Sequence, residues 1–176
     1  MLETKTSSRP WLRWIDTNTG SRIVTMPHPD GGARLRNCLE ELKGEGVQGI
    51  LSLLDPKEAE RIGLEEEPAL CIELGMEFFS LPIEDFGVPT DFYEAVDFLH
   101  PLAKRVADGF VLAIHCYAGL GRSTTIAASL LAFQDIDPDD TFGHLGDVIG
   151  RAVPETPEQA NWARSVHSFL KQGSEG

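Results

Sequence analysis

The fold is decided by residues 110–123, which read FVLAIHCYAGLGRS. The first five residues are apolar and match the length of a buried strand, and the segment from Arg122 has the pattern of a helix. A loop of small residues between a strand and a helix is typical of α/β proteins. We therefore expect an α/β fold with a central, mainly parallel twisted sheet flanked by helices, in which this loop joins a core strand to a helix.

The rest of the chain alternates short β-prone runs with segments of helical periodicity. A turn signal at 18–20 separates the first two runs, which predicts a hairpin. Strands are predicted at 11–15, 22–25, 47–54, 76–81 and 110–114, and helices at 35–42, 56–62, 68–74, 91–108, 122–134, 138–151 and 157–172.

Chain length and cysteine content limit the domain organisation. A chain of 176 residues suits one domain, and its three Cys are too few for a disulfide scaffold. We expect a single domain over 11–172 between flexible segments at 1–10 and 173–176. Cys38 and Cys71 are expected to be small buried hydrophobic residues.

The acidic composition narrows the classes of partner. Lys and Arg total 15 against 28 Asp and Glu, which gives a net charge of −13. The resulting field repels phosphate backbones and acidic headgroups, so we expect neither nucleic acid nor membrane as a partner. Since no apolar stretch is long enough to span a membrane and the first residues carry no secretory signal, the expected location is cytoplasmic.

The loop after the predicted strand has the chemistry of a phosphate cradle. Gly119 and Gly121 stand where the backbone must turn tightly or a side chain would intrude. The helix that begins near Arg122 adds unpaired N–H groups and the positive end of its dipole. The Arg122 guanidinium can bind two phosphoryl oxygens at once, so the loop backbone of 117–122 and this side chain form an anion site.

Cys116 lies at the floor of this predicted cradle. The field that holds a dianion also stabilises a thiolate, so Cys116 is expected to be a nucleophile at neutral pH. The Ser123 hydroxyl is placed to donate a hydrogen bond to the sulfur and help it leave again. His115 is expected to hydrogen-bond the loop backbone, because the five His residues show no zinc-site spacing.

These residues resemble the signature of the cysteine-dependent protein tyrosine phosphatase superfamily, and in particular its dual-specificity branch. The family signature is His-Cys, five residues, Arg, then Ser or Thr, and residues 115–123 match every fixed position. The low-molecular-weight branch fits less well, because it carries its Cys near the N-terminus. The resemblance covers about residues 20–170 and implies a phosphatase domain with catalytic Cys116, Arg122 and Ser123 and a phosphate loop of Tyr117, Ala118, Gly119, Leu120, Gly121 and Arg122.

The resemblance also implies a general acid upstream of the loop. Residues 81–89 (LPIEDFGVP) look like the family's Pro-Ile-x-Asp loop, which assigns the acid to Asp85. Glu84 and Asp91 are the competing carboxylates. Glu84 should point away if Asp85 faces inward, and Asp91 stands where an N-cap of the next helix is expected.

Two further residues and one acidic run have less specific roles. Gln159 lies in a stretch, TPEQAN, that resembles a family segment in which a Gln lies near the active site and helps to position hydrolytic water. Some relatives protect the nucleophile by pairing it with a second Cys, and Cys71 is the candidate if the fold brings it close. The acidic run at 65–67 is expected to be solvated surface.

The leading hypothesis is a protein tyrosine or dual-specificity phosphatase that acts through a phosphocysteine intermediate. Its expected substrate is a phosphorylated protein or peptide. We expect a monomer that needs neither a metal ion nor an organic cofactor. Tyr117, Ala118 and Leu120 supply no base, whereas lipid-directed relatives often carry Lys in the loop. The alternatives are a phosphatase of phosphoinositides or other small molecules on the same scaffold, and a pseudophosphatase that binds phosphorylated partners without turnover.

Overall fold

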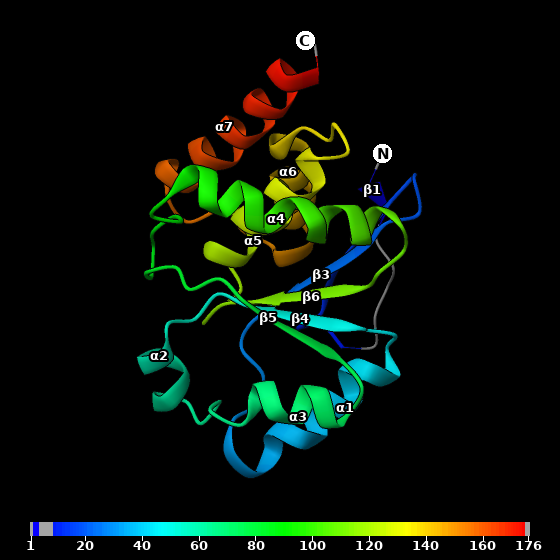
Figure 1. Cartoon of the computed structure of the whole chain (residues 1–176), viewed down its shortest axis with the longest axis vertical. Helices are drawn as coiled ribbons and strands as arrows, with labels where there is room; N and C mark the ends of the chain where they lie inside the picture. Colours follow the sequence, from blue (N-terminus) through cyan, green and yellow to red (C-terminus); the bar gives the residue numbers. More distant parts are fainter. Residues whose placement is uncertain (1, 4–8, 175–176) are drawn as a thin grey trace.

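Six strands form one sheet in the computed structural model, which describes residues 2–3 and 9–174 (Figure 1). The strand order is β1-β2-β3-β6-β4-β5. β3, β6, β4 and β5 are parallel, and β2 and β1 add to the edge of β3 in antiparallel pairing. The expectation of a mainly parallel sheet is therefore confirmed. The strands are β1 (Leu2–Glu3), β2 (Arg13–Thr17), β3 (Arg22–Met26), β4 (Gly49–Ser52), β5 (Glu77–Ser80) and β6 (Leu112–His115).

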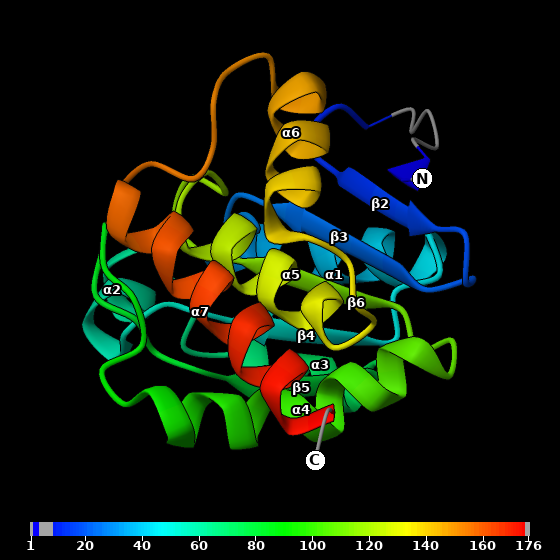
Figure 2. The ribbon, with the colours of Figure 1, turned by 90° about the horizontal axis from the view of Figure 1, so that it is seen from above.

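Helices cover both faces of the sheet. Figure 1 shows α4 to α7 on one face and α1 to α3 on the other. Figure 2, which looks onto the first of these faces, shows α5 in the middle of its group. The helices are α1 (Leu35–Gly44), α2 (Pro56–Arg61), α3 (Glu67–Glu73), α4 (Phe92–Ala107), α5 (Arg122–Ala132), α6 (Pro138–Ile149) and α7 (Pro157–Ser174), and a 3-10 turn (Gly32–Arg34) precedes α1.

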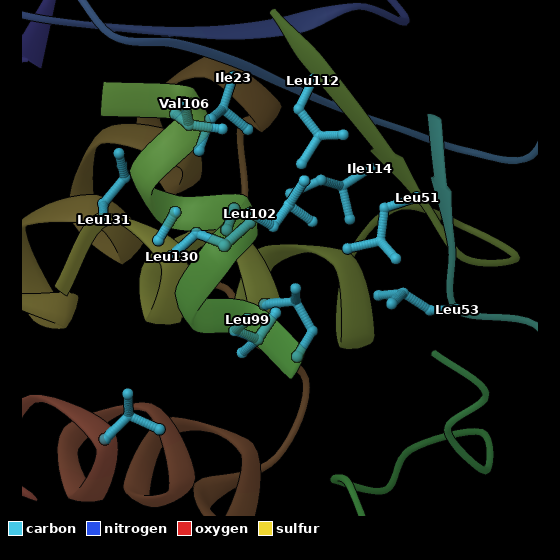
Figure 3. Packing of buried hydrophobic residues seen from close by; sticks show 14 of the residues in the cluster. Ile23, Leu51, Leu53, Leu99, Leu102, Val106, Leu112, Ile114, Leu130 and Leu131 are labelled. Atoms are coloured by element: carbon cyan, nitrogen blue, oxygen red, sulfur yellow. The ribbon is translucent and has the colours of Figure 1, made fainter. Parts of the chain in front are cut away.

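The strand β6 supplies apolar side chains to both layers because successive residues of a strand point to opposite faces. Leu112 and Ile114 belong to the core under α4 to α7, and Ala113 belongs to the core under α1 and α3. Figure 3 shows Leu112 and Ile114 facing Leu102 of α4. The central position of β6 fixes the point where the following loop leaves the sheet.

Helix α5 is buried along its whole length, although it carries several hydroxyl side chains. It packs against β3 and β6 and against α4, α6 and α7. Thr125 Oγ1 donates to the Gly121 carbonyl at 2.8 Å, and Ser129 Oγ donates to the Thr125 carbonyl at 2.8 Å. These backbone partners allow Thr125 and Ser129 to occupy a buried helix, because each of the two hydroxyl groups has a hydrogen-bond acceptor.

Most of the predicted elements are confirmed, and the ends of the chain differ from expectation. The hairpin is present, but its first strand begins at Arg13 and continues to Thr17. Within the N-terminal segment expected to be flexible, Leu2 and Glu3 pair with Thr17 and Asp16, and residues 1 and 4–8 lie outside the described residues. Likewise α7 continues to Ser174, and only 175–176 of the expected C-terminal tail lie outside the described part. Within the described ranges, no helix is both long and apolar enough to cross a membrane.

The parallel strands bring two loops to the same edge of the sheet. The loop after β6 begins at Cys116, and the loop after β5 contains Asp85. Since the carboxyl ends of parallel strands meet at one edge, these loops lie near each other although about 30 residues separate them. This edge is where ligands bind in open α/β sheets.

Candidate active site

The loop after β6 places Cys116 and Ser123 together. Cys116 is 3% exposed, and its Sγ accepts a hydrogen bond from the Gly119 backbone N–H at 3.3 Å. Ser123 Oγ lies 3.5 Å from the same sulfur. Both groups can donate to a thiolate, so the surroundings of Cys116 suit a negatively charged sulfur.

Gly119 is required by its conformation and by its neighbours. Its φ is +72°, a region that residues with a Cβ rarely adopt. A Cβ on Gly119 would also lie 2.5 Å from Arg13 Nη1 and 2.6 Å from the Met26 carbonyl carbon. Arg13 Nη1 donates to the Gly119 carbonyl at 2.7 Å, so a residue of β2 that the sequence analysis missed supports the loop.

Gly121 is required only for space, because its φ of −103° is ordinary. A Cβ there would lie 2.9 Å from Gln159 Nε2 and 3.1 Å from Glu155 Oε2. The start of α7 therefore packs directly against the loop. Glu155 is a carboxylate close to the loop that the sequence analysis did not identify.

Arg122 is buried at the start of α5 and reaches three groups. Nη1 donates to Glu58 Oε2 at 2.8 Å and to the Ile83 carbonyl at 2.9 Å. Nη2 donates to Glu58 Oε1 at 3.1 Å and lies 3.1 Å from Asp85 Oδ1. Burial alone would lower the pKa of Arg122, but the hydrogen bonds to Glu58 and the surrounding negative groups outweigh it and raise the pKa. The guanidinium thus joins the loop after β6 to the loop after β5.

Glu58, the main partner of Arg122, was not identified by the sequence analysis. It is 7% exposed in α2, and its Oε2 also accepts a hydrogen bond from the Asp55 N–H at 3.1 Å. Asp55 in turn accepts from the Glu58 N–H, which completes a capping box. The sequence Asp55-Pro-Lys-Glu58 carries the capping-box signal, so the helix start was detectable, but the contact with Arg122 was not.

His115 pairs with a residue that was expected to be exposed. Its Nε2 lies 2.9 Å from Glu67 Oε1, and its Nδ1 lies 3.3 Å from the Cys116 carbonyl. Glu67 is 2% exposed, so the prediction of a solvated acidic run is wrong at this position. The reason is that α3 begins at Glu67 and points its first turn toward the end of β6, where the imidazole offers a partner. The predicted hydrogen bond of His115 to the loop backbone is present.

Asp85 lies in a turn of the loop after β5. The Gly87 N–H donates to the Glu84 carbonyl at 2.9 Å and closes this turn. Asp85 Oδ1 accepts from the Phe86 N–H at 3.0 Å, and the Asp85 side chain remains 54% exposed. The competing Asp91 caps α4 by accepting from the Glu94 N–H at 2.9 Å, as expected. The exposed Glu84 has no contact with Arg122, so of these three carboxylates only Asp85 reaches it.

The variable positions of the loop carry no positive charge. Tyr117 is exposed, and the centre of its ring lies 5.0 Å from that of the His28 ring. The backbone N–H of His28 donates to the Tyr117 carbonyl at 3.1 Å. Ala118 is exposed, and Leu120 packs against the core on the α4 to α7 face. The surface around the mouth of the loop is therefore aromatic and small rather than basic at these three positions.

Gln159 is completely buried at the start of α7. Its Nε2 donates to the Gly87 carbonyl at 3.2 Å, and its Oε1 accepts from the N–H groups of Glu155 and Thr156 at 3.1 and 3.2 Å. The structure thus brings Gln159 next to both loops, as the sequence analysis anticipated in part.

The other two cysteines lie apart from Cys116. Cys71 packs in the core on the α1 and α3 face, whereas Cys116 belongs to the opposite core, and all three thiols are free. Burial, together with the charge of Glu67, raises the pKa of Cys71 to about 12. Pairing of Cys71 with Cys116 is therefore not supported. Cys38 is half-buried rather than buried.

Among the residues that the structure describes, no cluster of three or more His, Cys, Asp or Glu side chains could hold a metal ion.

The chain is similar to known proteins both in sequence and in fold. The family model described as "Polymorphic toxin system, DSP-PTPase phosphatase" matches residues 24–135. The cyclin-dependent kinase inhibitor 3 of Rattus norvegicus is 31% identical over 132 residues, which cover 74% of this chain and 60% of that protein.

Solved structures share the fold. The crystal structure of kinase associated phosphatase with its catalytic-site cysteine substituted by serine superposes with a TM-score of 0.77 at 24% identity, over 94% of this chain and 98% of the other. The crystal structure of PTPMT1 in complex with PI(5)P gives a TM-score of 0.69 at 19% identity, over 86% and 94% of the two chains. At these identities the likeness concerns the fold alone.

Proposed function

Because the chain belongs to the DSP-PTPase phosphatase family of polymorphic toxin systems, we propose that it hydrolyses phosphomonoesters on proteins or peptides through a phosphocysteine intermediate at Cys116. The observation that carries this proposal is the position of one sulfur. Cys116 Sγ accepts a hydrogen bond from the Gly119 N–H and lies beside the Ser123 hydroxyl. The loop that begins at Cys116 leads into the first turn of α5, which carries the buried Arg122. A helix N-terminus and a guanidinium at one site favour a bound dianion and a thiolate together.

Arg122 has one edge left for a phosphoryl group. Three of its N–H groups serve Glu58 and Ile83, and none of its hydrogen bonds uses Nε. The Nε hydrogen and the Nη2 hydrogen that faces Asp85 form a fork that matches two phosphoryl oxygens. The incoming phosphoryl group displaces Asp85 from Nη2, which frees the carboxyl group to face the leaving oxygen.

The first chemical step is attack of the Cys116 thiolate on phosphorus. The S–P bond forms as the bond from phosphorus to the leaving oxygen breaks, and Asp85 donates its proton to that oxygen. Arg122 and the backbone N–H groups of the loop stabilise the charge of the equatorial oxygens. In the second step water attacks phosphorus, the Asp85 carboxylate accepts its proton, and the departing sulfur receives a hydrogen bond from Ser123.

A phosphorylated protein or peptide is the substrate class that the site supports best. Tyr117, Ala118 and Leu120 present no base for additional phosphates, and the net charge of −13 disfavours polyanionic ligands. These three positions of the described loop therefore offer no positive charge for the additional phosphates of an inositol phosphate. A pseudophosphatase is disfavoured because the chain retains the nucleophile and the arginine of the signature and has a carboxylate, Asp85, in the loop after β5.

Hydrolysis of para-nitrophenyl phosphate tests the proposal. We expect turnover by the wild-type chain and none by Cys116→Ser, which should still bind vanadate. Asp85→Asn should lower kcat by about 10²- to 10⁴-fold, whereas Glu84→Gln, an exposed neighbour in the same turn, should leave kcat unchanged.

Vanadate binding without turnover by the wild-type chain would indicate a pseudophosphatase. A loss in Glu84→Gln that matches or exceeds the loss in Asp85→Asn would refute the assignment of the acid. A panel of phosphopeptides, inositol phosphates and nucleotides, with Cys116→Ser as the blank, distinguishes the substrate classes.

A further inference from the structure

We propose that Gln159 is a positioning residue that holds the turn carrying Asp85 against the Cys116 loop, so that it controls protonation of the leaving group. The proposal rests on the phosphatase activity proposed above. In this proposal Gln159 acts in the first chemical step, by positioning Asp85. The family resemblance implies a different role, the orientation of hydrolytic water in the second step.

The orientation of the Gln159 amide is fixed by its own helix start. Two backbone N–H groups, those of Glu155 and Thr156, point at one end of the amide, so that end must be the oxygen. The nitrogen is therefore directed to the Gly87 carbonyl, 3.2 Å away. The oxygen already accepts two hydrogen bonds and the side chain is completely buried, so neither the oxygen nor the N–H that binds Gly87 is available to orient a water molecule.

The turn at 84–87 needs support from outside. It contains Phe86 at a φ of +60°, a conformation that is disfavoured for a residue with a Cβ, and the Phe86 ring is exposed and contributes little packing. Arg122 holds the turn on one side through the Ile83 carbonyl, and Gln159 holds it on the other through the Gly87 carbonyl. Asp85 lies between these two attachment points.

Gln159 also touches the loop that carries the nucleophile. A Cβ on Gly121 would lie 2.9 Å from Gln159 Nε2 and 3.0 Å from its Oε1, so the amide packs directly on the Gly121 backbone. One buried side chain therefore contacts both the acid-bearing turn and the anion loop. Its removal should change the distance between Asp85 and the leaving oxygen without removing any group that binds the phosphoryl oxygens.

The substitution Gln159→Glu removes this contact, and Gln159→Met removes it without adding a negative charge beside the anion loop. A carboxylate keeps an acceptor for the N–H groups of Glu155 and Thr156 but cannot donate to the Gly87 carbonyl. Gln159→Met, which has similar length and no polar end, is the second variant if the first does not fold. Glu158→Gln, an exposed change at the adjacent position of α7, is the matched control.

The measurement is kcat across aryl phosphates whose phenols range from strongly to weakly acidic. For phenyl phosphate, whose leaving group needs a proton, we expect kcat of Gln159→Glu to fall by about tenfold or more. For 2,4-dinitrophenyl phosphate, whose leaving group needs none, we expect a change of less than about twofold. In the Asp85→Asn background, Gln159→Glu should cause no further loss, because both changes remove the same proton transfer.

Three results would overturn the inference while leaving the phosphatase activity in place. The first is an equal loss of kcat for all leaving groups with a burst of phenol release, which would place Gln159 in the hydrolytic step. The second is that both Gln159 variants have the same rates as Glu158→Gln. The third is a loss of kcat in Gln159→Glu that adds fully to the loss in Asp85→Asn. Absence of turnover in the wild-type chain would instead refute the proposed function itself.

Discussion

The substitution Glu58→Gln tests whether the buried pair beneath the anion loop supports both folding and catalysis. Glu58 binds Arg122 through both oxygens, at 2.8 and 3.1 Å, and the two side chains are 9% and 1% exposed. Gln keeps the shape of Glu58 but removes its charge and one of its two acceptors. Arg122 would then be a buried cation whose main partner is neutral.

The expected loss of stability follows from the burial of both groups. Removing one partner of a buried ion pair costs about 3–5 kcal/mol, and we expect the lower end because Gln retains one acceptor oxygen. For a domain of this size each kcal/mol corresponds to roughly 2–4 °C, so Tm should fall by about 6–12 °C. The freed guanidinium should also leave its position beside the loop, and kcat/KM should fall by about 10²-fold.

Urea unfolding and aryl phosphate kinetics measure the two effects, with Glu60→Gln as the control on the same helix. Glu60 is exposed, so its substitution should change the free energy of unfolding by less than about 0.5 kcal/mol. Equal stability and equal kcat/KM in the two variants would refute the assignment of Glu58 as the support of Arg122.

Two further predictions concern the loop and the second buried thiol. Gly119→Ala should lower kcat by more than about 10²-fold with the helical circular dichroism signal retained, since a Cβ would meet Arg13 Nη1 at 2.5 Å; wild-type kinetics would contradict the required backbone geometry. Because burial raises the pKa of Cys71 to about 12, iodoacetamide at pH 8 should leave Cys71 unmodified in the folded chain and modify it after unfolding in urea. Peptide mass spectrometry checks this, and rapid labelling of Cys71 before unfolding would disprove it.

The sequence was most informative where the determinants are local. The apolar run 110–114, the two glycines and Arg122 lie within 13 consecutive residues, so the strand, loop and helix around Cys116 could be predicted together. The N-cap role of Asp91 was likewise readable, because its partner, the Glu94 N–H, lies only three residues away.

The residues that were missed interact across long distances in the chain. Glu58 lies 64 residues from Arg122, Glu67 lies 48 residues from His115, and Arg13 lies 106 residues from Gly119. Whether a carboxylate is solvated or buried depends on the partner that the fold supplies, and a local pattern does not contain that partner. For this reason an acidic run that looked like surface contained a buried hydrogen-bonding residue.

Gln159 falls between these cases. Its proximity to the Cys116 loop could be expected from the resemblance, but its hydrogen-bond partner could not. The Gly87 carbonyl is a backbone group 72 residues away, and no side-chain pattern marks it.

Whether Cys116 itself carries the phosphoryl group during turnover can be measured by rapid quench. The wild-type chain is mixed with para-nitrophenyl phosphate, denatured within milliseconds and digested for mass spectrometry. We expect phosphate on the peptide that contains Cys116, at a level that rises with the release of nitrophenol and disappears in Cys116→Ser. Turnover with phosphate on a different residue, or with an unmodified Cys116 throughout a burst of nitrophenol, would contradict a phosphocysteine mechanism.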